Sequence, residues 1–376
     1  MDPGSVQNRR DLARYLQAQM EAARLPWPPP YEGADGDLEA EGRTAVKTYL
    51  LEAHACDAPT NEPLKFFSDL RQRLGLRVKE TQDPALLWLR VGEHDFWCDT
   101  SMGRFWRLHT AAPVKDADDI RTRLVAGSPW LDNVWLPPSM LEALPRETAS
   151  QMQTFSLNHD RRPLTSASAA GGDLDYVSMR LWASRASETL AKLRVANVFP
   201  HGVSIRSVRI RSEAEEDNGE FCVSEYYHHG KVTVTGNSFD VHNSLLVHVV
   251  RSYRDLVEGI ERRFGLGYAD GDPARLVGDP VVLEMEWTVG DFEYAVGRMF
   301  ASVEPFRLWA LPEQLTPHWY RARAVDLHVG QTLTFDVTPD HVLIQLPRGT
   351  CGNTIVRFVA SLQAHLNSDA GKALLN

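Results

Sequence analysis

Residues 341–358 read HVLIQLPRGTCGNTIVRF and combine a strand, a glycine-bearing turn and the start of a helix. The run HVLIQL predicts the strand, and Gly349 and Gly352 permit a tight turn after it. The apolar residues that follow at helical spacing are Ile355, Val359, Leu362 and Leu366. This strand, turn and helix close a larger pattern that fills residues 174–376.

The second half of the chain predicts an order of strands and helices that occurs twice. The first set has strands at 176–182, 203–211, 220–228, 231–235 and 238–241 and helices at 183–194 and 242–264. The second set, after a loop at 265–280, has strands at 281–287, 306–310, 319–327, 332–337 and 342–346 and helices at 291–301 and 353–366. We therefore predict a duplicated antiparallel sheet-plus-helix domain, β-α-β-β-β-β-α written twice, with repeats at about 176–264 and 281–366.

In topology alone, the doubled order is similar to the saddle of the TATA-box-binding fold, and one repeat is similar to a half-sized helix-grip fold. The resemblance implies curved antiparallel sheets, each with a long helix across one face, placed side by side as one continuous sheet. It implies nothing about function.

The first half of the chain predicts a smaller α+β domain. An N-terminal helix at 8–23 is followed by a proline-rich and acidic linker. The expected elements after it are helices at 44–54 and 63–74, strands at 86–92, 94–100 and 103–111, and a helix from 116. The fold class is α+β, with a helix and linker at 1–42, a small domain at 43–159, a linker at 160–173 and the duplicated domain at 174–376.

Composition predicts a cytoplasmic globular protein without a membrane partner. The 376 residues suit two domains, and the hydrophobic content of 43% is typical of folded chains. Neither a signal-like segment nor a membrane-length apolar run occurs. The cysteines lack CxxC spacing, which favours a reducing compartment; they are Cys56, Cys98, Cys222 and Cys351. The net charge of −10 disfavours non-specific nucleic-acid binding.

Cys351 has three interpretations: a nucleophile, part of an anion cradle, or a residue that starts a helix. A strand, a glycine turn and a helix N-terminus can hold an anion, and Arg348 and Arg357 are close in sequence. The segment lacks the Lys-Ser/Thr of a P-loop and the third glycine of a dinucleotide motif. Helix capping by Thr350 or Asn353 is therefore favoured.

Two constellations could support chemistry. Asp326 and His328 share a strand face and His341 begins the next-but-one strand, so with Cys351 they could form an orienter, a base and a nucleophile. The histidines and carboxylate of the second constellation are His228, His229, Asp240 and His242. A metal site is conceivable there, but surface histidines are favoured, and we predict neither a metal nor a cofactor.

Arginines provide the remaining signal. Residues 176–211 carry seven basic side chains against one acidic, and Arg321 and Arg323 share a strand face at the equivalent place in the second repeat. The predicted nucleic-acid contacts are Arg180, Arg206, Arg209, Arg211, Arg321, Arg323 and Arg348. The acidic run EAEEDNGE at 213–220 weakens this interpretation.

We therefore expect a non-enzymatic binding component of a larger assembly. A concave sheet face would take nucleic acid or, second, a protein partner. Two alternatives stay open. One is a cysteine-dependent hydrolase or transferase that uses Cys351. The other is a helix-grip-like pocket for a small molecule between the long helices and the sheet.

Overall fold

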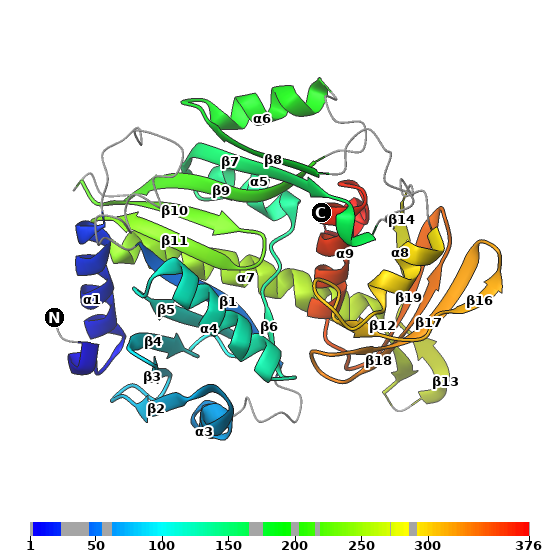
Figure 1. Cartoon of the computed structure of the whole chain (residues 1–376), viewed down its shortest axis with the longest axis horizontal. Helices are drawn as coiled ribbons and strands as arrows, with labels where there is room; N and C mark the ends of the chain where they lie inside the picture. Colours follow the sequence, from blue (N-terminus) through cyan, green and yellow to red (C-terminus); the bar gives the residue numbers. More distant parts are fainter. Residues whose placement is uncertain are drawn as a thin grey trace. The chain divides into compact units, whose positions relative to one another are not determined.

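The computed structural model describes residues 3–23, 45–54, 62–164, 176–196, 203–214, 219–270, 272–285 and 292–375 (Figure 1). The predicted linker after the first helix, Cys56 and most of the linker at 160–173 lie outside these residues. The chain forms two compact units. The first unit comprises Met1–Val134, Ala143–Gln153 and Val208–Ser252, and the second comprises Trp135–Glu142, Thr154–Ser207 and Tyr253–Asn376.

The first unit is built on an antiparallel sheet with the strand order β2-β3-β4-β5-β1-β11-β10-β9, in which β6 also pairs with β1. Its strands are β1 (Val46–Ala53), β2 (Leu76–Glu80), β3 (Leu86–Val91), β4 (His94–Asp99), β5 (Phe105–Thr110), β6 (Leu131–Asn133), β10 (Phe221–Tyr227) and β11 (Lys231–Gly236). Its helices are α1 (Arg9–Ala22), α3 (Pro63–Leu74) and α4 (Val114–Gly127), with the short η1 (Pro3–Ser5). The elements α5 (Pro138–Glu147), β7 (Gln151–Asp160), β9 (Ser204–Glu213) and α7 (Phe239–Phe264) contribute residues to both units.

The core of the first unit lies between this sheet and the helices α3 and α4. Phe67 of α3 packs on Trp106 of β5, with ring centroids 5.5 Å apart. The helix predicted at 44–54 is wrong, because this segment is the central strand β1, paired with β5 and β11. Every residue of β1 is buried, so the strand lacks the alternation that would have distinguished it from a helix.

The second unit holds an eight-stranded sheet with the order β13-β12-β19-β18-β17-β15, in which β14 also pairs with β19 and β16 with β17. Its strands are β12 (Gly265–Ala269), β13 (Asp272–Val277), β14 (Val281–Glu284), β15 (Leu308–Trp309), β16 (Glu313–Thr316), β17 (Trp319–Asp326), β18 (Thr332–Val337) and β19 (His341–Pro347). Its other elements are η3 (Arg162–Leu164), β8 (Tyr176–Trp182), which pairs with β7, and the helices α6 (Ala186–Val195), α8 (Phe292–Met299), α9 (Asn353–His365) and α10 (Lys372–Leu375).

Strands β17, β18 and β19 alternate strictly between buried and solvent-accessible side chains, as the period-two pattern predicts. The buried side chains pack on α9, where Phe335 and Phe358 have ring centroids 5.1 Å apart. The strand and the helix predicted from residues 341–358 are therefore confirmed as β19 and α9. No helix in the described part of the chain is long and apolar enough to cross a membrane.

The structure confirms the α+β class and corrects three further expectations. The short strand predicted at 238–241 is part of α7, which begins at Phe239. The loop predicted at 265–280 contains the hairpin β12–β13, whose side chains are mostly exposed and so carry no burial pattern. Strands β9 to β11 and strands β14 to β19 belong to different sheets, so the single continuous sheet of the saddle-like fold was wrong. The duplication and the domain limits stay predictions.

Candidate metal centre

His328 lies in the turn between β17 and β18. The N–H of Asp326 donates to the carbonyl of Gln331 at 2.8 Å, and the N–H of Gly330 donates to the carbonyl of Asp326 at 2.7 Å. Gly330 has φ of 72°, a backbone conformation that favours glycine. These bonds close the turn and hold His328, which is fully buried, just beyond the end of β17.

Gln331 connects this turn to the segment that carries Cys351. Its side-chain Oε1 accepts a hydrogen bond from the N–H of Cys351 at 3.1 Å, and its Nε2 donates to the carbonyl of Gly349 at 2.8 Å. Cys351 is fully buried and lies two residues before α9. One amide side chain therefore sets the position of the cysteine relative to the histidine.

The N-terminus of α9 is capped by α7. The N–H of Gly352 donates to Glu261 Oε1 at 2.8 Å, and a Cβ at Gly352 would lie 2.6 Å from the carbonyl oxygen of Val257, so only glycine fits. A carboxylate thus occupies the place that a bound anion would need. The segment starts a helix, as the favoured interpretation predicts, and the side chains of Glu261 and Gln331 accept hydrogen bonds from the N–H groups of Gly352 and Cys351.

A buried ion pair joins the His328 turn to α9. Asp326 accepts hydrogen bonds from Arg357 Nη2 at 2.5 Å, from Thr354 Oγ1 at 2.5 Å and from the N–H of His328 at 3.1 Å. Arg357 also donates from Nε to the carbonyl of Phe306 at 2.9 Å. Burial raises the pKa of Asp326, but the charges of Arg357 and His328 and these hydrogen bonds outweigh it and lower the pKa below its usual range.

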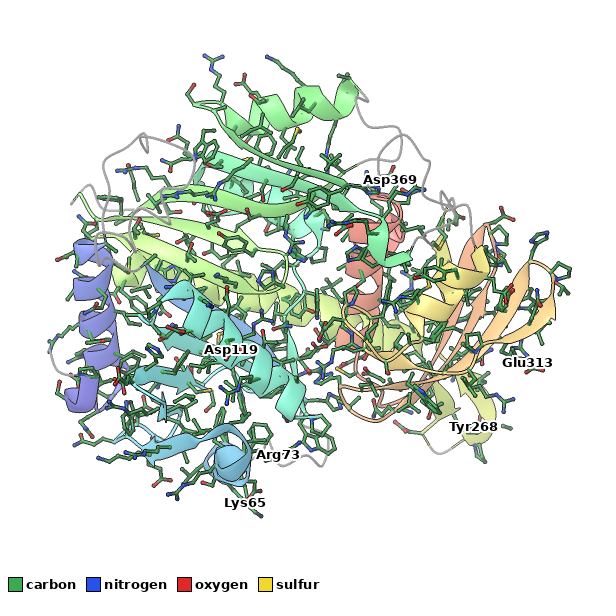
Figure 2. The ribbon with its side chains drawn as sticks, in the orientation of Figure 1. Lys65, Arg73, Asp119, Tyr268, Glu313 and Asp369 are labelled. Carbon is green, nitrogen blue, oxygen red and sulfur yellow. The ribbon has the colours of Figure 1, made fainter. Side chains whose placement is uncertain are left out.

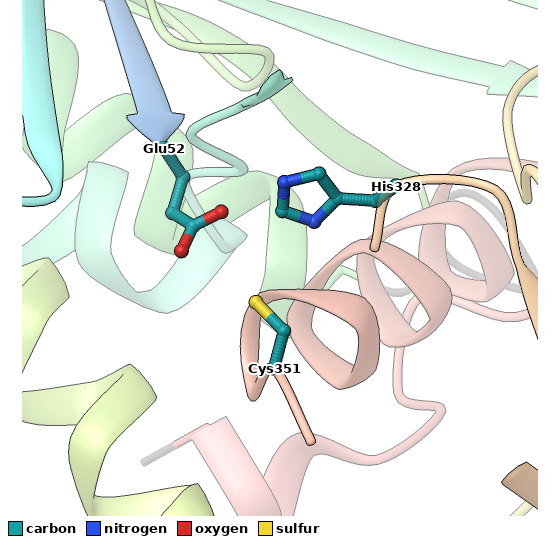
Figure 3. A group of neighbouring side chains, drawn as sticks. All are labelled: Glu52, His328 and Cys351. Carbon is teal, nitrogen blue, oxygen red and sulfur yellow. The ribbon is translucent and has the colours of Figure 1, made fainter. Parts of the chain in front are cut away.

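Cys351 Sγ and a ring nitrogen of His328 lie within 4.8 Å of each other (Figure 3). Zinc binds sulfur at about 2.3 Å and imidazole nitrogen at about 2.0 Å, so an ion between the two atoms needs a separation of at most about 4.3 Å. The observed upper limit of 4.8 Å is close to that separation. The pair could therefore act as two metal ligands or as a base and a nucleophile.

The sequence analysis proposed both residues, together with Asp326 and His341, as a possible orienter, base and nucleophile. His341 does not join them. It is exposed at the start of β19, where Thr338 Oγ1 lies 3.2 Å from its Nδ1. Cys351 follows the other end of this seven-residue strand, which spans about 20 Å. His341 is therefore too far from Cys351 to serve as its base.

Three of the seven predicted arginines are neutralised by carboxylates. The pairs are Arg211 with Glu213 at 3.0 Å, Arg321 with Asp336 at 2.8 Å and Arg348 with Asp270 at 3.0 Å. Arg180 lies over the ring of Trp182 at 5.3 Å, and Arg206, Arg209 and Arg323 are accessible to different degrees. These pairs weaken the electrostatic attraction for phosphates on which the prediction depended.

The two arginine ladders also lie on different sheets. Arg209 and Arg211 belong to β9, and Arg321 and Arg323 belong to β17. The expectation of two ladders on one sheet was therefore wrong. Nucleic-acid binding by these residues stays a prediction.

The second histidine constellation does not form a metal site. The rings of His228 and His229 meet edge to face at the β10–β11 turn, with centroids 4.9 Å apart. His242 is buried, and its Nδ1 lies 2.9 Å from Ser224 Oγ. In the described part of the first unit, no three side chains that could bind one ion gather. The expectation that His242 lies at the surface was wrong.

His242 belongs to a buried polar network in the first unit that the sequence did not reveal. His109 Nδ1 lies 2.9 Å from Thr48 Oγ1, 61 positions away in the chain. Arg107 donates to Asp99 Oδ2 at 2.5 Å and to Asn243 Oδ1 at 2.7 Å. Strand pairing and the packing of α7 bring these residues together, and no local sequence pattern predicts it.

The second unit has a groove of about 770 Å³, but this groove is not the small-molecule pocket that we expected between the long helices and a sheet. It is lined by Val282, Glu284, Met285, Asp340, His341, Asn367 and Asp369. These residues are mainly polar and come from β14, the start of β19 and the segment after α9. Apolar ligand pockets are lined differently, so the groove gives this alternative no support.

Together, the fold and the site define an α+β protein whose second unit carries a thiol–imidazole pair. The chain belongs to the MJECL33-like protein family, which matches residues 1–373. It is similar to the uncharacterized protein MJECL33 of Methanocaldococcus jannaschii, with 25% identity over 401 aligned residues that cover 97% of this chain and 93% of the relative. Neither name states an activity.

Proposed function

We propose that the second unit binds a transition-metal ion of the zinc class through Cys351 Sγ and a ring nitrogen of His328. The observation that carries this proposal is the close approach of the two buried donor atoms, which come from separate turns. Thiolate and imidazole together suit zinc and other borderline or soft ions. Zinc takes four ligands, so two positions remain for water or further groups.

Burial favours a metal ligand over a free nucleophile. Reactive cysteines sit in partly exposed, electropositive surroundings, whereas Cys351 is fully buried. The Glu261 carboxylate bound to the same helix N-terminus adds negative charge there. A divalent cation supplies the positive charge that a buried thiolate requires. Gln331 and Asp326 then serve as the outer residues that hold both ligands in position.

We expect the purified full chain to bind one Co²⁺ ion, used as a spectroscopic substitute for zinc, with a thiolate-to-cobalt charge-transfer absorption band. Cys351→Ser abolishes the band, because oxygen replaces the sulfur ligand. His328→Gln weakens Co²⁺ binding by more than about 10- to 100-fold, which is the usual loss for outer residues alone. Absorption titration measures both effects.

Cys98→Ser and His365→Gln are the matched controls, because they change a buried thiol and a largely buried imidazole elsewhere in the chain. Both should bind Co²⁺ like the unmodified protein. A charge-transfer band that survives Cys351→Ser, or a folded protein that binds no Co²⁺, contradicts the proposal. Circular dichroism of each variant confirms that it is folded.

A cysteine-dependent hydrolase or transferase is the second candidate, and the proximity of Cys351 to His328 supports it, although Asp326 contacts the backbone N–H of His328. It requires Cys351 in the metal-free protein to react with iodoacetamide faster than buried Cys98, and His328→Gln to slow that reaction. Mass spectrometry of the alkylated protein follows both thiols. Equal rates at the two cysteines eliminate this candidate.

A further inference from the structure

In the described residues, all large hydrophobic side chains with high exposure belong to the second unit. Four of them gather around β15, β16 and the start of β17. They are Trp309 (51% exposed), Leu311 (83%), Leu315 (38%) and Trp319 (37%). A cluster of exposed tryptophan and leucine is characteristic of a surface that binds another protein.

This cluster lies along the outward face of the sheet. Trp319, Arg321, Arg323 and Val325 alternate with buried residues on β17, so all four face outward. Trp309 pairs with Val325, and residues directly opposite share a face. By the same rule Glu313, which pairs with Arg321, also faces outward, and Figure 2 places it on the outer strand β16.

One anchor of this face is held in a single orientation. Trp319 donates from Nε1 to Asp336 Oδ1 at 2.9 Å, and Arg321 donates to both oxygens of the same carboxylate at 2.8 and 3.0 Å. An exposed indole that is already oriented loses little entropy on binding. Asp336 thus already pairs with Arg321, and Glu313 and Arg323 are exposed charges at the neighbouring outward positions.

The outward face has approximate two-fold symmetry along β17, because a tryptophan lies at each end and two opposite charges lie between them. Trp319 lies at one end, Trp309 beside Val325 lies at the other, and Glu313 and Arg323 lie between them at successive outward levels. The separation of the two ends is about 20 Å, from six residues at about 3.3 Å each. A two-fold axis perpendicular to β17 and midway between these levels exchanges the ends.

We propose that this face binds the same face of a second copy of the chain. About that axis, Arg323 of each copy meets Glu313 of the other, and Trp319 of each copy packs beside Trp309 of the other. The contact is isologous, and its apolar, aromatic and arginine-containing composition is that of protein interfaces. A face with exposed charges of both signs complements itself better than it complements a polyanion.

Packing face to face is favoured over extension of the sheet at its edge. Strand β16 lies at the edge, but Pro312 and Pro317 flank it, and its pairing with β17 shifts register between Gln314 and Thr316. Prolines and bulges are the features that prevent strands from adding to a sheet edge. The outward face is therefore the surface that remains for association.

We expect light scattering of the full chain to show a dimer that dissociates on dilution. Arg323→Glu and Glu313→Arg each place like charges together and raise the dissociation constant by about tenfold. The double variant Arg323→Glu/Glu313→Arg re-forms the pair with reversed polarity and restores the constant to within about threefold. Trp309→Asp and Leu311→Asp produce monomers.

Tyr268→Asp is the matched control, because Tyr268 is 64% exposed but lies on the β12–β13 hairpin (Figure 2). It should remain dimeric. A monomeric unmodified protein overturns the proposal, and so does a dimer that persists in Trp309→Asp and Leu311→Asp. Single charge variants whose effect is not reversed in the double variant overturn the two-fold arrangement. Thermal unfolding confirms that each variant is folded.

Discussion

Asp326→Asn is expected to lower the free energy of unfolding by about 3 to 5 kcal/mol. Asp326 and Arg357 are both fully buried, so the substitution leaves the Arg357 guanidinium in the interior without its counter-charge. The change also weakens the bonds that hold the His328 turn to α9. Urea unfolding followed by circular dichroism measures the loss.

Asp336→Asn is the control, because it breaks an arginine–carboxylate pair at the surface, where Arg321 is 38% exposed. Surface pairs contribute about 0 to 1 kcal/mol, so this variant should unfold almost like the parent. Asp326→Leu/Arg357→Met removes both buried charges and should recover at least half of the loss. Equal effects of Asp326→Asn and Asp336→Asn would show that the buried pair has no special role.

Acid should destabilise the protein through His109 and His242. Burial, and then the charge of Arg107, lowers the pKa of His109 to about 3. Burial, and then His109 and Arg107, lowers the pKa of His242 to about 3. In the unfolded chain these histidines have a pKa of about 6.5. Between about pH 6.5 and about pH 3 the unfolded state therefore binds more protons than the folded state, and the free energy of unfolding falls with pH.

The free energy of unfolding should therefore be constant above about pH 7 and decrease below it. Each histidine contributes a loss of about 2 kcal/mol between about pH 7.5 and about pH 5, because one pKa unit corresponds to about 1.4 kcal/mol. Urea unfolding at several pH values measures the slope. In His109→Gln/His242→Gln the slope should largely disappear.

His248→Gln is the control for this experiment. The side chain of His248 is 37% exposed and lies outside the buried network, so its replacement should leave the slope unchanged. The interpretation fails if the double variant keeps the slope of the parent. The double variant would also keep the slope of the parent if these histidines accepted protons in the folded protein. Spectroscopic titration would then show that they are charged near neutral pH.

Periodicity in the sequence was sufficient for most elements of the second unit. The strands β17 to β19 and the helix α9 each have one buried face, so apolar residues recur at two or at three to four positions. The sequence could also suggest the pair of Cys351 and His328, because these residues lie in turns that follow two strands of one sheet. The central strand β1 escaped detection, because burial on both faces removes its periodicity.

Sheet membership and side-chain pairing depend on contacts between distant parts of the chain. The strand order separates the two arginine ladders. It also brings Asp336 to Arg321 and Asp270 to Arg348, and no local sequence pattern predicts these ion pairs. The same long-range pairing assembles His109, Thr48 and the buried ion pair of Asp326 and Arg357. Local periodicity reports which face of an element is buried, whereas burial partners and pKa shifts arise only after the chain has folded.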